Sequence, residues 1–323
     1  MVSTTPLKPI LILAGPTATG KTALSIELAQ HYPNLEIISA DSLLVYQELD
    51  IGTAKPSLEE QNKILHHLID ICSPSENFTA SHFYRKTWEC LKEIEKRNHT
   101  ALIVGGTLFY IKTLLFGLWN APPTHPQLRN ELEVCSNLEL FKKLQSKDPQ
   151  LAFKITPFDR YRLIRALEIL ILSGQSPTAL QEKLPQDPHP LFHLWVIDRS
   201  PAELLHRIQI RTENMIQAGL IQEYQTLQKK YPTSRALKAI GYAQVERYLT
   251  QTPIRGRKIK PGIEGLKEEI TLATRQLVKT QRTWLKNLSL KVKNFKSFIL
   301  DRDLENLKQD FTSFYYPNHK KNS

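Results

Sequence analysis

Residues 10–22, with the sequence Ile-Leu-Ile-Leu-Ala-Gly-Pro-Thr-Ala-Thr-Gly-Lys-Thr, decide how the rest of the chain is interpreted. The apolar run Ile10 to Leu13 predicts a buried strand of a parallel sheet, and residues 23–30 have the apolar spacing of a helix. Between them stands Gly15-x-x-x-x-Gly20-Lys21-Thr22, the spacing of a phosphate-binding loop. The stretch therefore predicts a strand, a phosphate loop and a helix at the beginning of an α/β fold.

The chemistry of this loop follows from its residue types. The glycines allow backbone N–H groups to turn toward a polyphosphate, and the N-terminus of the following helix adds a positive dipole. Lys21 adds a full charge, and the hydroxyl of Thr22 can reach Mg²⁺. A chance match is the alternative, but the position of the motif at the first strand-to-helix turn argues against it. The predicted phosphate ligands are Gly15, Pro16, Thr17, Ala18, Thr19, Gly20, Lys21 and Thr22.

Length and composition indicate a globular protein larger than one average domain. With 323 residues, the chain has room for one large α/β unit with an insertion or a second lobe. Hydrophobic residues make up 41% of it, yet no apolar stretch approaches membrane-spanning length, and the segment 7–14 is too short for a signal peptide. We therefore expect a cytoplasmic protein that makes no membrane contact. Its three scattered cysteines favour packing roles over a disulfide or zinc site.

The net charge of +11 points to a polyanionic partner. The excess is concentrated in residues 254–296, which contain twelve Lys or Arg against three Glu. A charge run more often marks a solvated face, but this one lies in a segment with helical spacing, which favours a nucleic-acid surface. Residues 274–285 are expected to be a helix with three cations in one row: Arg275, Lys279 and Arg282.

Two further apolar strands are predicted to end beside the phosphate loop. Residues 35–40 lead into Asp41, and residues 101–105 lead into Gly106-Thr107. Because parallel strands in an open α/β sheet present their carboxyl ends to one ligand crevice, Asp41, Thr107 and Lys21 should converge there. A glycine pair alone would be an ordinary turn. The convergence of the three residues predicts a site.

The segment that follows Asp41 contains a loop and a histidine pair. Asp50-Ile-Gly-Thr-Ala-Lys55-Pro56 is rich in turn residues and contains a lysine. Residues 66–71 are predicted to form a short strand, in which the adjacent His66 and His67 would point to different sides. For these histidines we expect hydrogen-bonded structural roles and no shared metal ion.

Strand signals stop after Gly117 and return only at residues 193–197, which we expect to be the final strand of the sheet. The intervening helical segments predict an insertion. Its third helix begins with Arg160, Arg162 and Arg165, an unfavourable place for cations in the helix dipole, which suggests an anionic partner or else solvated arginines. The predicted organisation is a P-loop core (1–120), a helical insertion (121–190), core completion with a basic helical region (191–296), and a polar tail that frays (297–323).

The predicted site suits transfer from a pyrophosphate-containing substrate. If the loop holds a leaving diphosphate, Asp41 can accept the proton of the incoming nucleophile. Lys21, Lys55 and Arg211 can neutralise the leaving charge. Combined with a basic surface, these residues suggest alkyl transfer to a nucleic acid.

A series of sequence blocks from about residue 10 to 287 resembles the bacterial tRNA dimethylallyltransferases. The Asp-Ser and Asp-Ile-Gly-Thr-Ala-Lys-Pro blocks are more specific than the phosphate loop alone. The blocks are Gly15–Thr22, Ser39-Ala-Asp-Ser42, Tyr46, Asp50–Pro56, Val104-Gly-Gly-Thr107 with Tyr110, Arg162-Leu-Ile-Arg-Ala-Leu-Glu168, Gly241-Tyr242, and Thr274-Arg-Gln-Leu277 with Trp284.

The resemblance implies a fold, a reaction and partners. The fold would be a P-loop NTPase-like parallel sheet flanked by helices, with an all-helical insertion that grips the tRNA anticodon stem-loop. The reaction would move a dimethylallyl group from dimethylallyl diphosphate to N6 of adenine 37, in tRNAs that read codons starting with U. Mg²⁺ would be the cofactor and the protein a monomer. Extrusion of the target base would fit the way enzymes reach a base amine.

The resemblance also assigns individual residues. Asp41 would be the general base, Thr17 to Thr22 would hold the diphosphate with Thr22 on Mg²⁺, and Thr107 would contact the diphosphate or the target nucleotide. The chain departs from the family pattern at Tyr161 and Ala243. The tRNA contacts would be Asp41, Ser42, Leu43, Leu44, Thr107, Arg129, Tyr161, Arg162, Leu163, Ile164, Arg165, Lys238, Gly241 and Tyr242, with Arg275, Lys279 and Arg282 from the basic row.

Three other functions would require some of the same sequence features. A nucleoside or metabolite kinase needs the same loop and Mg²⁺, but it leaves the basic surface unexplained. An adenylate dimethylallyltransferase prenylates a free nucleotide and should not need the arginine-bearing insertion. A non-enzymatic RNA-binding protein would not need Lys21, Asp41 and Thr107 together.

Overall fold

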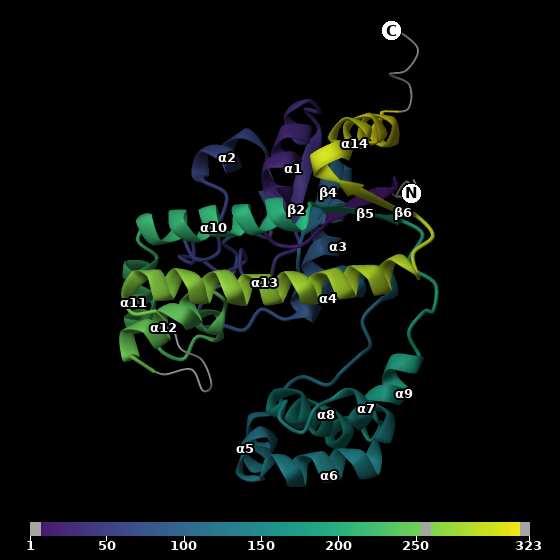
Figure 1. The fold of residues 1–323 in the computed structure, drawn as a ribbon. Coiled ribbons are helices and arrows are strands. Elements are labelled where there is room, and N and C mark those ends of the chain that lie inside the picture. The colour runs from purple at the N-terminus through teal and green to yellow at the C-terminus, as the bar shows by residue number, and fades with distance from the viewer. Residues whose placement is uncertain (1–7, 253–259, 317–323) are drawn as a thin grey trace. The chain divides into compact units, whose positions relative to one another are not determined.

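The computed structural model describes residues 8–252 and 260–316. As predicted, the fold is α/β, with one sheet of six strands flanked by helices (Figure 1). Every strand pairing is parallel, and the order is β3-β2-β4-β1-β5-β6. The strands are β1 (Ile10–Ala14), β2 (Leu35–Ser39), β3 (His66–His67), β4 (Thr100–Gly105), β5 (Phe192–Asp198) and β6 (Phe295–Ile299). Since β4 lies between β1 and β2, the segments that follow these three strands are neighbours at one edge.

Alternate residues of the strands supply the apolar layer on one face of the sheet. Leu11 and Leu13 of β1, with the corresponding positions of the neighbouring strands, pack against α1 (Lys21–Gln30) and α14 (Leu300–Tyr315). Helix α3 (Ala80–Lys96) contacts β2 and β4. The α3 helix has its N-cap at Thr79, whose hydroxyl accepts the backbone N–H of His82. Helices α2 (Leu58–Lys63) and α4 (Leu108–Phe116) complete the segment before the insertion.

A group of helices after β5 builds the region that faces the strand ends. They are α10 (Pro201–Gln217), α11 (Leu220–Lys230), the 3₁₀ helix η1 (Arg235–Lys238), α12 (Tyr242–Thr250) and α13 (Gly262–Ser289). Helices α10 and α13 lie side by side (Figure 1), joined by Leu204, Ile208 and Val278. The predicted helix over residues 274–285 is therefore the C-terminal part of a longer one. Helix α10 ends at Gln217, and Gly219 follows with φ +99°, a backbone conformation that favours glycine.

The C-terminal region corrects two predictions. Residues 193–197 are not in the final strand, because β6 pairs in parallel with β5 and becomes the sheet edge. Residues 297–323 are not simply a polar tail: α14 buries Leu307 and Phe311 completely, and the Tyr315 hydroxyl donates to the carbonyl of Ala101. The apolar spacing along α14 was present in the sequence but was outweighed by the polar composition of the segment. The His-Lys-Lys-Asn-Ser end lies outside the described residues.

Residues Phe116–Asp187 form a second compact unit. Its helices are α5 (Pro126–Val134), α6 (Asn137–Lys147), α7 (Pro149–Lys154), α8 (Arg160–Ser173) and α9 (Pro177–Glu182). Its own apolar core takes Leu132, Leu140, Leu144 and Leu163 from three of these helices. The sequence pattern predicted α5, α6 and α8, whereas the short helices α7 and α9 were missed.

The predicted strand over residues 66–71 is reduced to His66–His67, and its histidines have the expected structural roles. Nε2 of His67 bonds Glu36, and Nδ1 of His66 bonds the carbonyl of Ile64. Glu36 is 2% exposed and also accepts hydrogen bonds from Arg97 and His99. Burial alone would raise the pKa of Glu36, but these partners outweigh burial and lower it to about 2.

None of the helices among the described residues has the length and apolar character needed to span a membrane.

Candidate functional site

A cavity of about 350 Å³ opens at the carboxyl ends of β1, β2 and β4. As predicted, it brings together Lys21, Asp41 and Thr107, which follow three different strands. Thr17 and Lys21 are the residues of the phosphate loop that line it. Helices α10 and α13 supply an opposite wall that includes Ile208, Arg211, Met215, Leu277, Gln281 and Trp284. One cavity therefore combines a phosphate loop, a carboxylate and an apolar surface.

The phosphate loop has the backbone geometry that anion binding requires. Gly20 has φ +94°, and α1 begins after it without a side-chain cap, so the first N–H groups of α1 have no intrahelical partner. These groups and the helix dipole attract an anion. Gly15 allows the loop to lie against β5, because a Cβ there would come within 2.4 Å of the Ile197 carbonyl oxygen.

Cationic side chains hold the carbonyl groups of the same loop. Lys21 Nζ donates to the Pro16 carbonyl at 2.7 Å, Arg207 Nε to Ala18 at 2.9 Å, and Arg199 Nε to Thr19 at 2.8 Å. The loop carbonyls are thus paired within the protein, which leaves loop N–H groups for a ligand. Sequence reasoning did not select Arg199 or Arg207 for the site, although Arg207 lies one helical turn before Arg211.

Burial makes the charged form of Lys21 less favourable. Desolvation lowers the pKa of Lys21 to about 8, although the nearby Asp41 acts in the opposite direction. Desolvation also lowers the pKa of Arg211, and Asp41 again opposes this shift. These two cations and Asp41 therefore influence one another electrostatically. A bound diphosphate would compensate the buried positive charge.

The Asp41 carboxylate is fixed by its own turn. Its Oδ1 accepts the backbone N–H of Leu43 at 2.8 Å and of Leu44 at 3.4 Å. Its Oδ2 has no hydrogen-bond partner among the described residues. Thr107 Oγ1 accepts the N–H of Ser42 at 2.9 Å and donates to the Ser42 hydroxyl at 3.2 Å, which ties the loop after β4 to the Asp41 turn. One carboxylate oxygen is therefore positioned and the other is available to accept a proton.

Gln281 of α13 joins the two loops on either side of Lys21. Its Oε1 accepts the N–H of Thr17 and its Nε2 donates to the carbonyl of Gly106, both at 3.0 Å. The side chain is buried and lines the cavity. Sequence reasoning missed this residue because a glutamine in a basic helix has no local signature of such a role.

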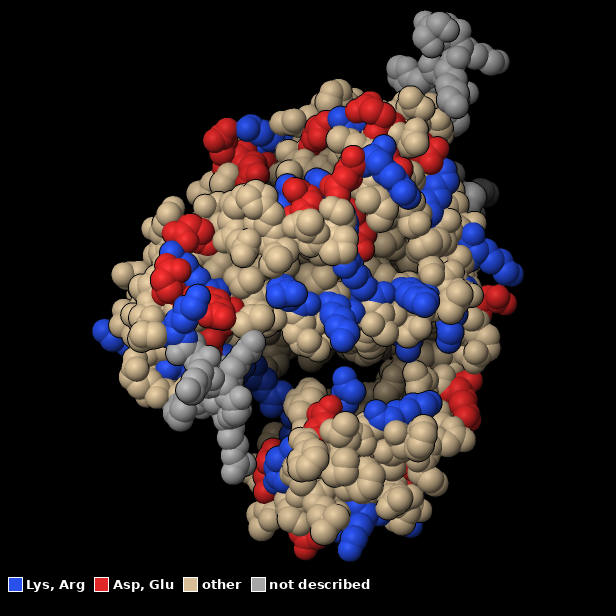
Figure 2. All heavy atoms as spheres, viewed as in Figure 1, with Lys and Arg blue, Asp and Glu red and all other residues tan. Residues whose placement is uncertain are grey.

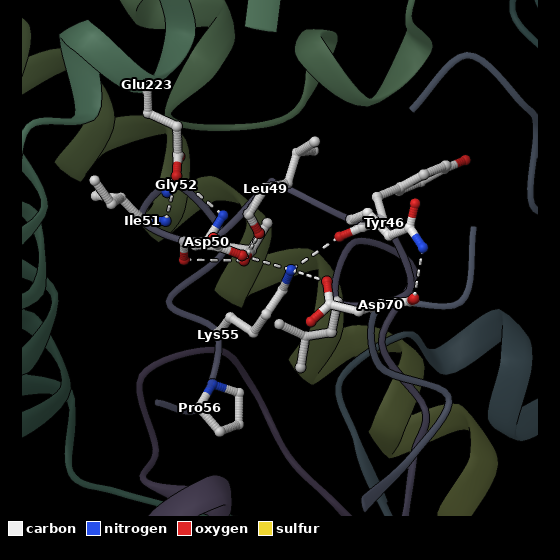
Figure 3. A network of polar contacts seen from close by, with 12 residues as sticks. Tyr46, Leu49, Asp50, Ile51, Gly52, Lys55, Pro56, Asp70 and Glu223 are labelled. Carbon is white, nitrogen blue, oxygen red and sulfur yellow. Dashed lines mark hydrogen bonds and ion pairs between the residues drawn. The ribbon is translucent and has the colours of Figure 1, made fainter. Parts of the chain in front are cut away.

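Lys55 does not have its predicted role. Its ammonium group is buried between the carboxylates of Asp50 and Asp70 and donates to the Tyr46 carbonyl at 2.9 Å (Figure 3). These partners neutralise it outside the cavity wall, so Lys55 is not a diphosphate ligand. Arg211 does line the cavity, and its role as a diphosphate ligand stays a prediction.

The hydroxyl of Thr22 is a suitable ligand for Mg²⁺, as the prediction requires, although Thr22 does not line the cavity. Its hydroxyl oxygen has no hydrogen-bond partner in the part of the chain that the structure describes. Within the same residues, no cluster of three His, Cys, Asp or Glu could hold a metal by itself. Mg²⁺ commonly takes few protein ligands and completes its shell with substrate phosphates and water. A threonine hydroxyl beside a phosphate loop is consistent with that pattern.

The arginines of α8 find anionic partners inside the helical unit. Arg129 and Arg165 both pair with the carboxylate of Glu168, which is fully buried. Arg160 donates to the Glu133 carboxylate and to carbonyls at the end of α5. The unfavourable position of Arg160 and Arg165 in the α8 dipole is thus explained without an external anion, so it no longer argues for one, and the anionic partner stays a prediction. Arg129 and Arg165 have structural partners, and Arg162 is largely exposed.

Three of the predicted RNA contacts are buried side chains. Leu163 and Ile164 lie in the core of the helical unit, and Tyr242 is fully buried against Gly52. Their side chains stabilise the fold and are not available to RNA. Among the other predicted contacts, Lys238 and Tyr161 are exposed, while Ser42, Leu43 and Gly241 line the cavity.

The basic row on α13 divides into two parts. Arg275 and Lys279 are exposed, whereas Arg282 forms two hydrogen bonds with the Asp198 carboxylate at 2.8 and 2.9 Å. Figure 2 shows Lys and Arg side chains along the surface where Figure 1 places α13. Arg255, Arg257 and Lys258 of the predicted basic segment lie outside the described residues.

Comparison with known proteins agrees with this geometry. A family model described as IPP transferase matches residues 44–288. A tRNA dimethylallyltransferase 1 from Citrifermentans bemidjiense is 39% identical over 281 residues, which cover 85% of this chain and 88% of that protein. A tRNA dimethylallyltransferase from Francisella tularensis subsp. novicida is 40% identical over 292 residues, with coverages of 87% and 91%.

Solved structures give the same answer. The full-length tRNA isopentenylpyrophosphate transferase from Bacillus halodurans is similar with a TM-score of 0.66 and 31% identity, over 97% of this chain and 96% of that chain. A eukaryotic dimethylallyltransferase acting on tRNA shares the fold with a TM-score of 0.77 and 24% identity, over 95% and 78% of the two chains. The family model covers most of the chain, and the bacterial relatives align over nearly their whole length. The chain therefore belongs to the IPP transferase family, as its sequence blocks predict.

Proposed function

We propose that this protein is a tRNA dimethylallyltransferase that uses dimethylallyl diphosphate and modifies N6 of adenine 37 in tRNAs reading codons that start with U. The observation that carries the proposal is the position of the Asp41 carboxylate in one cavity with the phosphate loop and an apolar wall. An apolar wall beside the phosphate loop suits a substrate that joins a diphosphate to an apolar chain, whereas a kinase leaves the exposed cations of α13 unexplained. A prenyl diphosphate presents both kinds of group.

The reaction assigns a task to each side of the cavity. The diphosphate binds to loop N–H groups and Lys21, while Arg211 adds a second charge. The dimethylallyl group lies against Ile208, Met215 and Leu277. The apolar wall excludes water, which would otherwise hydrolyse an allylic carbon that carries a good leaving group.

The transfer itself forms one bond and breaks another. The N6 nitrogen of adenine forms a bond to C1 of the dimethylallyl group as the bond from C1 to the diphosphate oxygen breaks. Oδ2 of Asp41 accepts the proton from N6, while Oδ1 remains bonded to the Leu43 N–H. The electron pair of the broken bond leaves with the diphosphate, whose charge is stabilised by Lys21, Arg211 and the loop. Mg²⁺, held through Thr22, would add positive charge at the same leaving group.

The RNA would contact the basic surface of the chain. Arg275 and Lys279 are exposed cations suited to phosphate groups. Arg162 and Tyr161 present a charge and an aromatic ring on the helical unit, which we propose binds the anticodon stem-loop. We further propose that the protein acts as a cytoplasmic monomer. An enzyme for free AMP would not need these surfaces.

A single labelling experiment tests the proposal. The purified protein is incubated with Mg²⁺, labelled dimethylallyl diphosphate and either an anticodon stem-loop with three consecutive adenines or free AMP. Label in the stem-loop alone is the expected result. Label in AMP alone would reassign the protein to nucleotide prenylation, and ATP hydrolysis without label in either acceptor would indicate kinase-type chemistry.

A further inference from the structure

The loop Asp50–Pro56 is a sequence block whose purpose the cavity alone does not explain. Its most conspicuous contact is a carboxylate from α11. Oε2 of Glu223 accepts the N–H groups of Asp50 at 3.0 Å and Ile51 at 2.8 Å, and Oε1 accepts the N–H of Gly52 at 2.9 Å (Figure 3). One side chain thus binds three consecutive backbone donors.

Tyr242 of α12 completes this arrangement. Its hydroxyl donates to Oε1 of Glu223 at 2.6 Å, and its ring packs on Gly52 so closely that a Cβ there would lie 2.4 Å from the ring. Burial raises the pKa of Tyr242, and the charge of Glu223 adds to the shift, so the hydroxyl keeps its proton and remains a donor. The absence of a side chain at Gly52 therefore allows Tyr242 to pack on the loop and donate to Glu223.

The opposite side of the loop is also fixed. The ammonium group of Lys55 bridges the carboxylates of Asp50 and Asp70, and the hydroxyl of Thr53 donates to the Leu49 carbonyl at 2.6 Å. The loop is thus held in one conformation from both sides. These contacts stabilise the loop, and they also determine the direction in which its backbone carbonyl groups point.

One of these carbonyl groups, that of Thr53, contacts a side chain of the cavity. Gly52 and Thr53 line it, and the carbonyl of Thr53 accepts a hydrogen bond from Nη2 of Arg211 at 3.1 Å. Among the described residues, this is the one hydrogen bond that the Arg211 guanidinium forms. A buried guanidinium with a single protein partner has its remaining donors available to a ligand.

We propose that Glu223 is a positioning residue that acts through the Asp50–Pro56 loop on Arg211, and that Tyr242 holds Glu223 in place for this purpose. Glu223 does not touch the substrate. By fixing the Thr53 carbonyl, it sets the direction in which Arg211 presents its free N–H groups to a diphosphate. The assignment of the diphosphate to this cavity rests on the proposed function.

The test is a double-mutant cycle on the binding of inorganic pyrophosphate with Mg²⁺, measured by calorimetry on the full chain. In Glu223→Gln, the carboxamide has one acceptor oxygen and places its NH₂ group against backbone donors. Hydrogen bonds to charged groups are worth enough that we expect the pyrophosphate Kd to rise about tenfold. In an Arg211→Met background, the same substitution should change Kd less than about twofold, because the residue on which Glu223 acts is absent.

A second variant keeps the test valid if Glu223→Gln fails to fold. Tyr242→Phe keeps the ring on Gly52 and removes only the hydroxyl, so it should weaken pyrophosphate binding less than Glu223→Gln, and this effect should also vanish with Arg211→Met. The matched control is Glu213→Gln, since Glu213 is a half-exposed partner of Lys267 outside the cavity and should leave Kd unchanged.

Equal losses of affinity in both backgrounds would overturn the proposal, because they would show a general structural effect. Unchanged affinity in Glu223→Gln and Tyr242→Phe would overturn it as well. Pyrophosphate binding does not require prenyl transfer. Hence a wild-type protein that binds pyrophosphate but transfers no label to RNA would refute the proposed function and leave this cycle interpretable.

Discussion

Replacement of Gln281 by leucine tests whether α13 holds the two loops of the active site. Leucine is apolar and one carbon shorter, and it can neither accept from Thr17 nor donate to Gly106, so two partly buried backbone groups lose their partners. An unsatisfied buried polar group costs about 1–3 kcal/mol. Because the nearby cavity offers some access to water, we expect the free energy of unfolding to fall by about 2–4 kcal/mol in total.

The loss of the two Gln281 hydrogen bonds should also weaken ligand binding. Thr17 begins the turn of the phosphate loop, and a loop that is no longer tied to α13 must be ordered by the ligand itself. We expect the pyrophosphate Kd to rise at least tenfold in Gln281→Leu. Gln281→Glu keeps the acceptor for Thr17 but faces the Gly106 carbonyl with a carboxylate, so its negative charge should weaken pyrophosphate binding further.

Urea unfolding and calorimetry with pyrophosphate measure these effects. The control is Gln276→Leu, an exposed position on the same helix, which should change the free energy of unfolding by less than about 0.5 kcal/mol. If Gln281→Leu matches this control in both stability and pyrophosphate affinity, the bridge between the loops has no energetic value and our reasoning is refuted.

Three further predictions concern the fold and the charges. Phe311→Ala should lower the free energy of unfolding by about 3–5 kcal/mol in urea, because the ring is fully buried; no effect would mean that α14 is not part of the folded core. Glu36 has its pKa lowered to about 2, so its stabilisation is present above the ordinary value of 4.5 and is lost as pH falls toward 2. Glu36→Gln should therefore be about 3 kcal/mol less stable than wild type at neutral pH and equal to it near pH 2, and a pH-independent difference would contradict this cause. Lys21 has its pKa lowered to about 8, so wild-type affinity for pyrophosphate should fall between pH 7 and 9, whereas Lys21→Arg, which stays charged, should lack that step in calorimetry.

The sequence predicted the parts of the fold that depend on local pattern. The strand, loop and helix from Ile10 to Gln30 and the convergence of Asp41 and Thr107 on one crevice are confirmed. Each of these rests on the periodicity of apolar residues or on the rule that parallel strands end at one edge.

Two of the wrong predictions concern ion pairs that sequence reasoning did not recognise. Lys55 looked like a phosphate ligand because its loop is polar, but its partner Asp70 lies fifteen residues away and neutralises it. The arginines of α8 looked unpaired although Glu168 lies only three residues after Arg165, and the pairing of Glu168 with Arg129 joins two helices. A sequence shows a charge, whereas only the fold shows which charge faces it.

The same limit explains the missed residues. Gln281 and Glu223 act on backbone groups more than 170 residues away, and backbone donors leave no trace in the sequence. The strand β6 and helix α14 were missed for another reason, since a polar composition was given more weight than the apolar stripe through Leu307 and Phe311.

The measurement that tests the central claim most directly compares Asp41→Asn with wild type in two assays: single-turnover transfer of labelled dimethylallyl to the anticodon stem-loop, and equilibrium binding of the same stem-loop. Asparagine can still accept the Leu43 N–H through its carbonyl oxygen, but it cannot take the proton of N6. If Asp41 is the general base, the transfer rate falls by a factor of about 10²–10⁴ while the Kd for the stem-loop changes less than about twofold. A transfer rate close to that of wild type, or a loss of binding as large as the loss of rate, would contradict the account.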